Sequence, residues 1–270
     1  MTAAAPETPP PASPRVEVTV ADGIGEIRFN RPELLNALDV AMSRDFAAAV
    51  ERLLADPGVQ VIVLSGAGRA FIAGGDLASF QAAADKSAVA EELLGLLHPA
   101  LLRLSEDARP VVASLRGAVA GGGMGVALAA DLAIAAEDVK FSVAYVGVAA
   151  NPDCTLSWNL VHTVGLRKAM ELALLGGAVG GAEALRLGLV NRLVPADELE
   201  AQTRAIALRL AAQSGLSMGR TKALLRAAAT TALPAQMEAE HAAFVRGAAT
   251  ADFAEAIDAF LGKRKPNFTR

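Results

Sequence analysis

Five glycines lie among the nine residues of the segment GAVAGGGMG, Gly117–Gly125. Glycine destabilises the interior of a helix or strand by roughly 0.5–1 kcal/mol relative to alanine, so this cluster implies that another group approaches the main chain closely. Gly122 is predicted to begin a helix, and the start of a helix offers unpaired N–H groups and the positive end of the helix dipole. We therefore expect the approaching group to be a negatively charged oxygen.

The composition of the chain argues against several other functions. Its 270 residues, 53% of them hydrophobic, suffice for one large domain or for a domain with a small appendage. The net charge of −4 and the single Trp and Tyr argue against a nucleic-acid surface. The single cysteine excludes an intrachain disulfide and a multi-cysteine zinc site, and no spacing of ligand residues suggests a metal. We expect neither nucleic acid nor metal as a partner, and a reducing, cytoplasmic compartment.

The N-terminal segment is predicted to be a disordered tail. Residues 1–14, MTAAAPETPPPASP, hold five prolines and no apolar core run. They lack the basic start and the long apolar stretch of a secretory signal. Elsewhere the apolar runs end before the ~18–20 residues that a membrane helix needs, so we expect a soluble protein with no membrane partner.

The pattern of apolar residues indicates a parallel α/β core. The segments 15–20 and 24–29, joined by ADG, are predicted to form a hairpin, and Asp39 is expected to cap the next helix. Short apolar runs typical of buried strands then alternate with helical patterns: strands at 59–64, 110–115 and 132–136, and helices near 87–106 and 122–130. This alternation predicts crossover connections in a parallel sheet.

From residue 166 onward the chain is predicted to be mostly helical. The expected helices are 166–175, 182–187, 196–212, 216–230, 234–246 and 251–261, with a short strand at 189–194. We therefore divide the chain into the tail, an α/β core over 15–195 and a helical C-terminal region over 196–270.

Three stretches in order along the chain carry a resemblance to a known family. They are FNRPELLNALD at 29–39, AFIAGGDL at 70–77 and SLRGAVAGGGMGVALAADLAIA at 114–135, with weaker matches at 176–194 and 259–268. They resemble the crotonase (enoyl-CoA hydratase/isomerase) superfamily. The resemblance implies a ClpP/crotonase-type α/β fold, a spiral of ββα units with a helical C-terminal trimerisation region. It also implies an acyl-CoA thioester substrate, no cofactor beyond the coenzyme A that the substrate carries, and a homotrimer or a dimer of trimers.

The resemblance also assigns the binding groups. In the family, two main-chain N–H groups bind the thioester oxygen and stabilise an enolate, and by motif position these belong to Gly75 and Gly122. Positions that meet coenzyme A in the family are occupied here by Leu34, Ala73, Phe260 and Lys263. The last two often act from a neighbouring subunit, and a solvated basic tail is the alternative for Lys263.

Asp153 is the candidate for proton transfer. Hydratases of the family use two glutamates, and at their positions this chain has Gly125 and Tyr145, so hydration by the usual residues is not expected. Asp153, in ANPDCTLSW, lies in the loop before a predicted helix. Isomerases of the family that shift a double bond, including the ring-epoxide isomerase of phenylacetate breakdown, carry an Asp in a similar context. A helix cap is the alternative for this residue.

His98 and Tyr145 keep a second chemistry open. By position they fall where an aromatic-acyl-CoA dehalogenase of the family has its water-activating histidine and a tryptophan that donates to the carboxylate. There the carboxylate, here Asp153, would attack the ring and form an ester. A packed side chain is the alternative for His98, and Gly75 departs from the dehalogenase, which has Phe there.

Other polar residues have structural interpretations. Asp76 is expected to cap the next helix, Asp131 to anchor a turn and Cys154 to be a small buried side chain. Ser114 lacks the GxSxG context of a nucleophile.

The sequence thus predicts an enzyme, most simply an enoyl-CoA isomerase that uses Asp153 as a proton shuttle and stabilises a thioester enolate. The alternatives are a hydratase, which is a lyase, with atypical catalytic residues, and a dehalogenase that uses Asp153 and His98. A noncatalytic member that binds acyl-CoA or RNA belongs to another class. A peptidase of the Clp type is disfavoured because no Ser–His–Asp set is placed.

Overall fold

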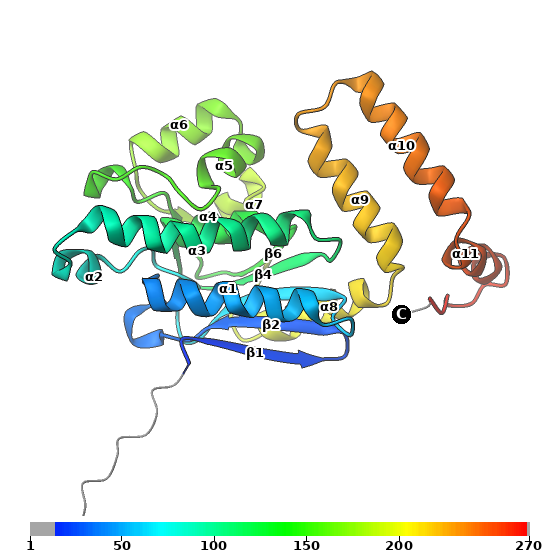
Figure 1. The fold of residues 1–270 in the computed structure, drawn as a ribbon, viewed down its shortest axis with the longest axis horizontal. Helices are drawn as coiled ribbons and strands as arrows, with labels where there is room; N and C mark the ends of the chain where they lie inside the picture. Colours follow the sequence, from blue (N-terminus) through cyan, green and yellow to red (C-terminus); the bar gives the residue numbers. More distant parts are fainter. Residues whose placement is uncertain (1–13, 269–270) are drawn as a thin grey trace, which may run out of the picture.

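A six-stranded sheet forms the centre of the protein in the computed structural model, which describes residues 14–268. Its strands run in the order β1-β2-β3-β4-β6-β9, and a smaller sheet has the order β5-β7-β8 (Figure 1). The strand bounds are β1 Val16–Ala21, β2 Ile24–Phe29, β3 Val61–Gly66, β4 Val111–Leu115, β5 Ala118–Ala120, β6 Leu132–Ala136, β7 Lys140–Ser142, β8 Val179–Gly180 and β9 Arg192–Val194. The predicted tail, apart from Pro14, lies outside the described residues.

Helices connect and cover these strands. Their bounds are η1 Pro32–Leu34, α1 Val40–Ala55, α2 Leu77–Ala82, α3 Lys86–Glu106, α4 Gly122–Ala129, η2 Val146–Val148, α5 Leu156–Val164, α6 Leu166–Leu174, α7 Gly181–Leu187, α8 Leu199–Ala211, α9 Gly215–Ala228, α10 Leu233–Ala248 and α11 Ala251–Leu261. Over residues 14–268, no helix has the length and apolar character needed to cross a membrane.

The hairpin predicted at the start of the core is confirmed. β1 and β2 pair antiparallel, and Ala21 faces Ile24 across a two-residue turn. The turn residues Asp22 and Gly23 have φ angles of 55° and 78°. Two successive positive φ angles give the type I′ turn, whose twist matches that of the paired strands.

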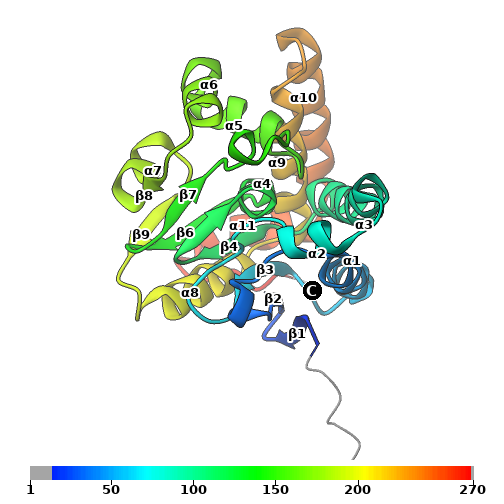
Figure 2. The same cartoon turned by 90° about the vertical axis from the view of Figure 1, so that its left-hand side faces the viewer.

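The remaining strands of the main sheet pair in parallel, as predicted, and both faces of the sheet are buried. In β3, Ile62 and Leu64 belong to a large apolar cluster with residues of α1 and α3, whereas Val61 and Val63 belong to a second cluster with α8. Figure 2 shows α8 and the α1–α3 pair on opposite sides of the sheet. Burial on both faces explains the unbroken apolar runs in the sequence.

The strand predicted at 189–194 is shorter than expected and begins only at Arg192. Gly188 ends α7 in the left-handed region, and the Leu189 amide still donates to the Ala184 carbonyl of that helix. These two residues therefore complete the helix end, which delays the strand.

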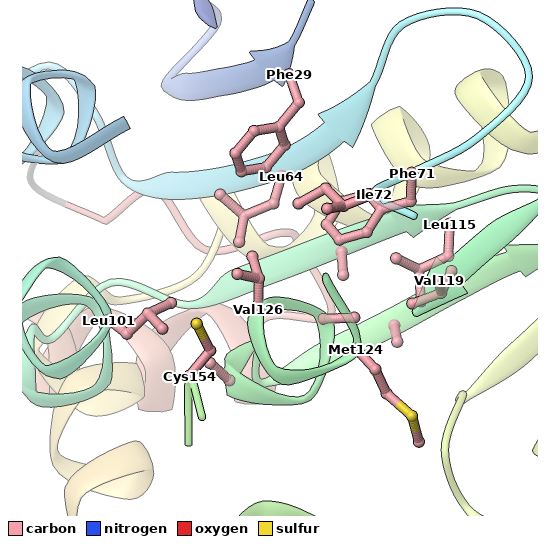
Figure 3. Packing of buried hydrophobic residues seen from close by; sticks show 14 of the residues in the cluster. Phe29, Leu64, Phe71, Ile72, Leu101, Leu115, Val119, Met124, Val126 and Cys154 are labelled. Atoms are coloured by element: carbon pink, nitrogen blue, oxygen red, sulfur yellow. The ribbon is translucent and has the colours of Figure 1, made fainter. Parts of the chain in front are cut away.

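Helix α4 lies in the interior of the molecule. Seven of its residues are buried and none is charged. Figure 3 shows Met124 and Val126 of α4 in one cluster with Ile72, Leu115 and Val119 of the surrounding segments. Apolar packing on all sides therefore fixes where the N-terminus of α4 points.

The C-terminal helices α9, α10 and α11 project from the rest of the protein (Figure 1). A cavity of about 1050 Å³ lies between them and core residues such as Pro110 and Leu132. The division of the chain at residue 195 stays a prediction. Helix α8, which that division assigns to the C-terminal region, packs against β3, β4 and β6 of the core sheet.

Candidate active site

Gly75 lies just before α2 with its amide free to bind a ligand. The Leu38 amide donates to the Gly74 carbonyl, and the Asp76 amide donates to the Leu38 carbonyl, both over 2.8 Å. These two bonds flank Gly75 in a parallel bridge, so the N–H of Gly75 itself points away from Leu38. Within residues 14–268 this amide has no hydrogen-bond acceptor, and Gly75 is exposed.

A polar network holds the segment that bears Gly75. The buried Asn36 side chain donates to the carbonyls of Ala67, Ala70 and Phe71, over 2.9–3.0 Å. Arg31 pairs with Asp76 over 2.8 Å. Sequence reasoning missed this role for Asn36 and Arg31, because their partners lie more than thirty residues away in the chain.

Asp76 links this network to α2. Its carboxylate accepts hydrogen bonds from the Ala78 and Ser79 amides, which confirms the predicted helix cap. Although burial alone would raise the pKa of Asp76, the Arg31 guanidinium and the two amides together hold it below its usual value. The residue after Gly75 is therefore fixed as a charged anchor.

Gly122 is the first residue of α4, whose opening amides have no partner inside the helix. Gly121 caps the helix with φ of 52°, and its carbonyl accepts from Met124 and Gly125. A Cβ on Gly121 would lie only 3.5 Å from the Gly74 Cα. Gly74 and Gly121 are therefore close together, and each of them directly precedes one of the two glycines predicted as oxyanion donors.

The Asp153 carboxylate lies beside the start of α4. A Cβ on Gly122 would be 3.3 Å from Asp153 Oδ1. The same oxygen accepts a hydrogen bond of 2.5 Å from the hydroxyl of the buried Tyr145. Burial, and after it the Asp153 charge, raise the pKa of Tyr145 far above its ordinary value, so the phenol stays protonated and donates.

Asp153 does not cap the helix that follows it, so this alternative interpretation is wrong. The N-cap of α5 is Thr155, which makes no side-chain cap bond, and the Asp153 side chain points to Tyr145 instead. Within the described ranges Asp153 also has no salt bridge. The carboxylate therefore has lone pairs that can accept a proton or a second hydrogen bond.

Gly125, one of the two positions where hydratases have glutamate, has no room for a side chain. A Cβ there would lie 2.4 Å from the Cys154 carbonyl oxygen and 2.8 Å from Cys154 Cβ. Cys154 is itself 1% exposed and belongs to the apolar cluster of Figure 3, which agrees with the predicted buried side chain. The space that a glutamate would need is therefore filled by the neighbour of Asp153.

His98 lies on α3 and reaches the same turn. Its Nε2 accepts a hydrogen bond of 3.2 Å from the Cys154 amide. The side chain is not packed in the core as the alternative interpretation held, because His98 is an exposed residue of α3. The structure thus joins Tyr145, Asp153 and His98 within one cluster around Cys154.

The four residues expected to meet coenzyme A do not all lie together in one chain. Leu34, 46% exposed, is in η1, and the Ala73 amide donates to the neighbouring Leu35 carbonyl. Phe260, 84% exposed, lies in the last turn of α11, and Lys263 follows the C-cap Gly262 of that helix. In Figure 1 helix α11 lies at the opposite end of the molecule from α2. A role for Phe260 and Lys263 from a neighbouring subunit stays a prediction.

The described residues hold no group of three His, Cys, Asp or Glu side chains arranged to bind a metal ion. Asp131, predicted to anchor a turn, bonds to the Val111 amide over 2.8 Å and pairs with Arg226 and Lys222. Ser114 is buried and accepts a hydrogen bond from the Thr203 hydroxyl. Neither residue belongs to the cluster around Cys154.

The order and geometry of these segments match one family. A family model described as enoyl-CoA hydratase/isomerase matches residues 19–270. The chain belongs to the enoyl-CoA hydratase/isomerase family. It is thus an acyl-CoA enzyme of the crotonase superfamily, as the sequence motifs predicted.

Relatives in this family carry both hydratase and isomerase names. The chain is 35% identical to a probable enoyl-CoA hydratase of Rhodobacter capsulatus, over 94% of this chain and 97% of that protein. It is 32% identical to the 1,2-epoxyphenylacetyl-CoA isomerase of Escherichia coli, over 93% and 96%. A crystal structure of an enoyl-CoA hydratase/isomerase from Mycobacterium abscessus, 33% identical, superposes with a TM-score of 0.89 over 94% of this chain and 99% of that one. The chain therefore has the fold of this family.

Proposed function

We propose that the protein is an enoyl-CoA isomerase that moves a double bond by proton transfer through Asp153. The observation that carries this proposal is the position of the Asp153 carboxylate. The carboxylate accepts a hydrogen bond from the Tyr145 hydroxyl, and its Oδ1 lies 3.3 Å from the position that a Cβ on Gly122 would take. A carboxylate beside the unpaired amides at the start of α4 is suited to take a proton from the carbon next to a bound thioester.

The reaction balances with one carboxylate and no other reagent. Asp153 takes a proton from C2 of a 3-enoyl-CoA, and the electron pair moves through C1 onto the thioester oxygen. The resulting dienolate spreads its charge to C4, where the protonated Asp153 returns the proton. The double bond then lies between C2 and C3, and the carboxylate is restored.

The amides of Gly75 and Gly122 would bind the enolate oxygen. Support comes from their lack of other partners in the described chain and from the contact between Gly74 and Gly121. Each donor of this kind contributes about 3–4 kcal/mol to lowering a barrier. Substitution of either glycine would add a Cβ at the place where the ligand oxygen must approach.

Hydration is the less favoured reaction, although several relatives carry that name. A hydratase needs a second acid–base group to activate water. Gly125 is closed by Cys154, and Tyr145 stays protonated because burial and Asp153 raise its pKa. With one available carboxylate, proton return to the substrate is the simpler outcome.

The test is turnover of 3-hexenoyl-CoA, followed by the absorbance of the conjugated product, with crotonyl-CoA hydration measured in parallel. We expect Asp153→Asn to lower kcat of isomerisation by about 10²–10⁴-fold, the contribution of a positioned acid–base group. The matched control is Asp197→Asn, at an exposed carboxylate before α8. Thermal unfolding verifies that both proteins are folded. Equal isomerase rates for Asp153→Asn and the wild type would then refute the proposal.

The bond from Tyr145 to Asp153 also suits a dehalogenase, in which Asp153 attacks an aromatic ring. Incubation with 4-chlorobenzoyl-CoA distinguishes the two reactions. Chloride release that needs Asp153, without turnover of 3-hexenoyl-CoA, would replace the isomerase proposal. Binding of both esters without any turnover would indicate a noncatalytic protein.

We also infer that copies of the chain assemble through α9–α11, as a trimer or a dimer of trimers. Large apolar side chains on these helices are exposed in the single chain: Leu225, Leu233, Phe244, Phe260 and Leu261, each 70–84% exposed. Exposed apolar area of this extent marks an interaction surface. Light scattering coupled to gel filtration should give a mass of three or six chains, and Phe244→Asp should lower it; a monomer would contradict the assembly.

A further inference from the structure

The turn that carries Asp153 has an unusual backbone. Cys154 and Thr155 have φ angles of 48° and 66°, in the left-handed region. Residues other than glycine rarely adopt this backbone region, and a β-branched residue such as Thr155 is an outlier there. Two such residues in succession must be held by the groups around them.

Three sides of Cys154 are held by other segments. The sulfur is near Gly122, the carbonyl oxygen packs against Gly125, and the amide donates to His98 Nε2. The first two contacts come from α4, and they depend on packing alone. The bond to His98 connects the turn to α3 and is the one polar contact of the three.

We propose that His98 is a positioning residue that holds the Asp153 turn in its strained conformation by accepting a hydrogen bond from the Cys154 amide. The inference rests on the proposed role of Asp153 as the proton shuttle. Asp153 directly precedes Cys154, so rotation of the Cys154 amide would turn the Asp153 carboxylate away from Gly122. His98 therefore acts on the reaction through the main chain.

The hydrogen bond also constrains what the imidazole can do. An Nε2 that accepts an amide proton carries no proton itself, so the proton of the neutral ring is on Nδ1. The lone pair that a general base would use is committed to the Cys154 amide. This assignment replaces the role of His98 as a water-activating base with a structural role at a catalytic turn.

Three substitutions of His98 test whether the protein needs a hydrogen-bond acceptor at this position or the imidazole ring itself. His98→Gln keeps an acceptor, because the Gln Oε1 reaches the position of Nε2. His98→Leu keeps the bulk without an acceptor, and His98→Asn has an acceptor too short to reach. If His98→Leu does not fold, the Gln and Asn pair supplies the same contrast.

The first readout is the kinetics of 3-hexenoyl-CoA isomerisation. We expect His98→Leu and His98→Asn to lower kcat by about 10²-fold, the effect of misplacing a catalytic group by about 1 Å, with KM changed by less than about threefold. His98→Gln should restore kcat to within about threefold of the wild type. A purely structural loss of folded protein would lower the active fraction without this rescue.

The second readout does not depend on activity. Cys154 is the only cysteine of the chain and is 1% exposed, and burial followed by the Asp153 charge raises the pKa of its thiol well above the ordinary value. Alkylation by iodoacetamide at fixed pH therefore reports opening of the turn. We expect the alkylation rate to rise at least about tenfold in His98→Leu and to stay near that of the wild type in His98→Gln.

The outcomes separate this inference from the proposed function. Wild-type kcat and alkylation in His98→Leu would overturn the positioning role while Asp153→Asn still abolishes isomerisation. Loss of activity in His98→Gln with unchanged alkylation would show that the imidazole itself reacts, which also overturns it. Full isomerase activity of Asp153→Asn would instead remove the proposed function on which the inference rests.

Discussion

Two aspartates lie at opposite ends of α4 and have contrasting partners. Asp131 follows the end of the helix, where its carboxylate bonds to the Val111 amide and pairs with Lys222 and Arg226 over 3.0 and 2.6 Å. Asp153 lies beside the start of the helix, where it accepts one hydrogen bond from the Tyr145 hydroxyl. Only the first aspartate has its charge balanced by cations within the described chain.

The difference follows the direction of the helix dipole. At the end of α4, Arg226 also donates to the Ala129 carbonyl, so the negative end of the dipole is met by cations. At the start, the positive end of the dipole and the Gly122 amide, which has no partner among residues 14–268, can meet a ligand. A fully paired carboxylate indicates a structural role, and a carboxylate with spare capacity beside unpaired amides indicates chemistry.

Substitution of Asp131 should produce the largest effect on stability. Asp131→Ala leaves Lys222, which is 8% exposed at its side chain, without the carboxylate that compensates it. Burial lowers the pKa of Lys222 and Asp131 opposes that shift, so the loss of Asp131 makes the charged amine more costly. Breaking a buried pair costs about 3–5 kcal/mol, and we expect about 3 kcal/mol because Arg226 is partly exposed.

The measurement is urea unfolding of the Ala variant, with Asp153→Asn as the counterpart from the other end of α4. The Asp153 variant should unfold within about 1 kcal/mol of the wild type, since one hydrogen bond is at stake. If the two variants changed stability equally, the contrast between a structural and a catalytic aspartate would not hold.

The sequence predicted the fold well because its signals are local. The buried strands read as apolar runs, the Asp22–Gly23 turn has its own dipeptide signature, and the helix that begins at Gly122 was located by its glycines. The start of β9 was harder to predict, because an apolar residue such as Leu189 suits both a strand and a helix end. Local patterns of this kind do not separate the two.

The site was predictable only in part, because its contacts cross the chain. The resemblance singled out Tyr145, Asp153 and His98, yet nothing in the spacing tells that His98 meets an amide fifty-six residues later. The same holds for Asp131, whose partners on α9 lie more than ninety residues away. Register and packing decide such contacts, and neither is written in the local sequence.

The smallest expected effect comes from the hydroxyl that touches Asp153. Tyr145→Phe removes the donor and keeps the ring, so the fold should stay intact while the carboxylate loses one stabilising contact. We expect kcat of isomerisation to fall about tenfold, the rate equivalent of ~1.4 kcal/mol.

The stability of the same variant gives the matched alkaline test. The folded pKa of Tyr145 is raised above the ordinary 10.0, so its contribution is present below that pH and is lost as pH rises above it. Between about pH 9 and pH 11, on either side of the ordinary tyrosine pKa of ~10, the free energy of unfolding should therefore fall less in Tyr145→Phe than in the wild type. Urea unfolding measures this difference. The same alkaline slope in Tyr145→Phe and in the wild type would contradict a buried phenol held protonated beside Asp153. Asp153 would then resemble Asp131 in depending on contacts other than this hydroxyl.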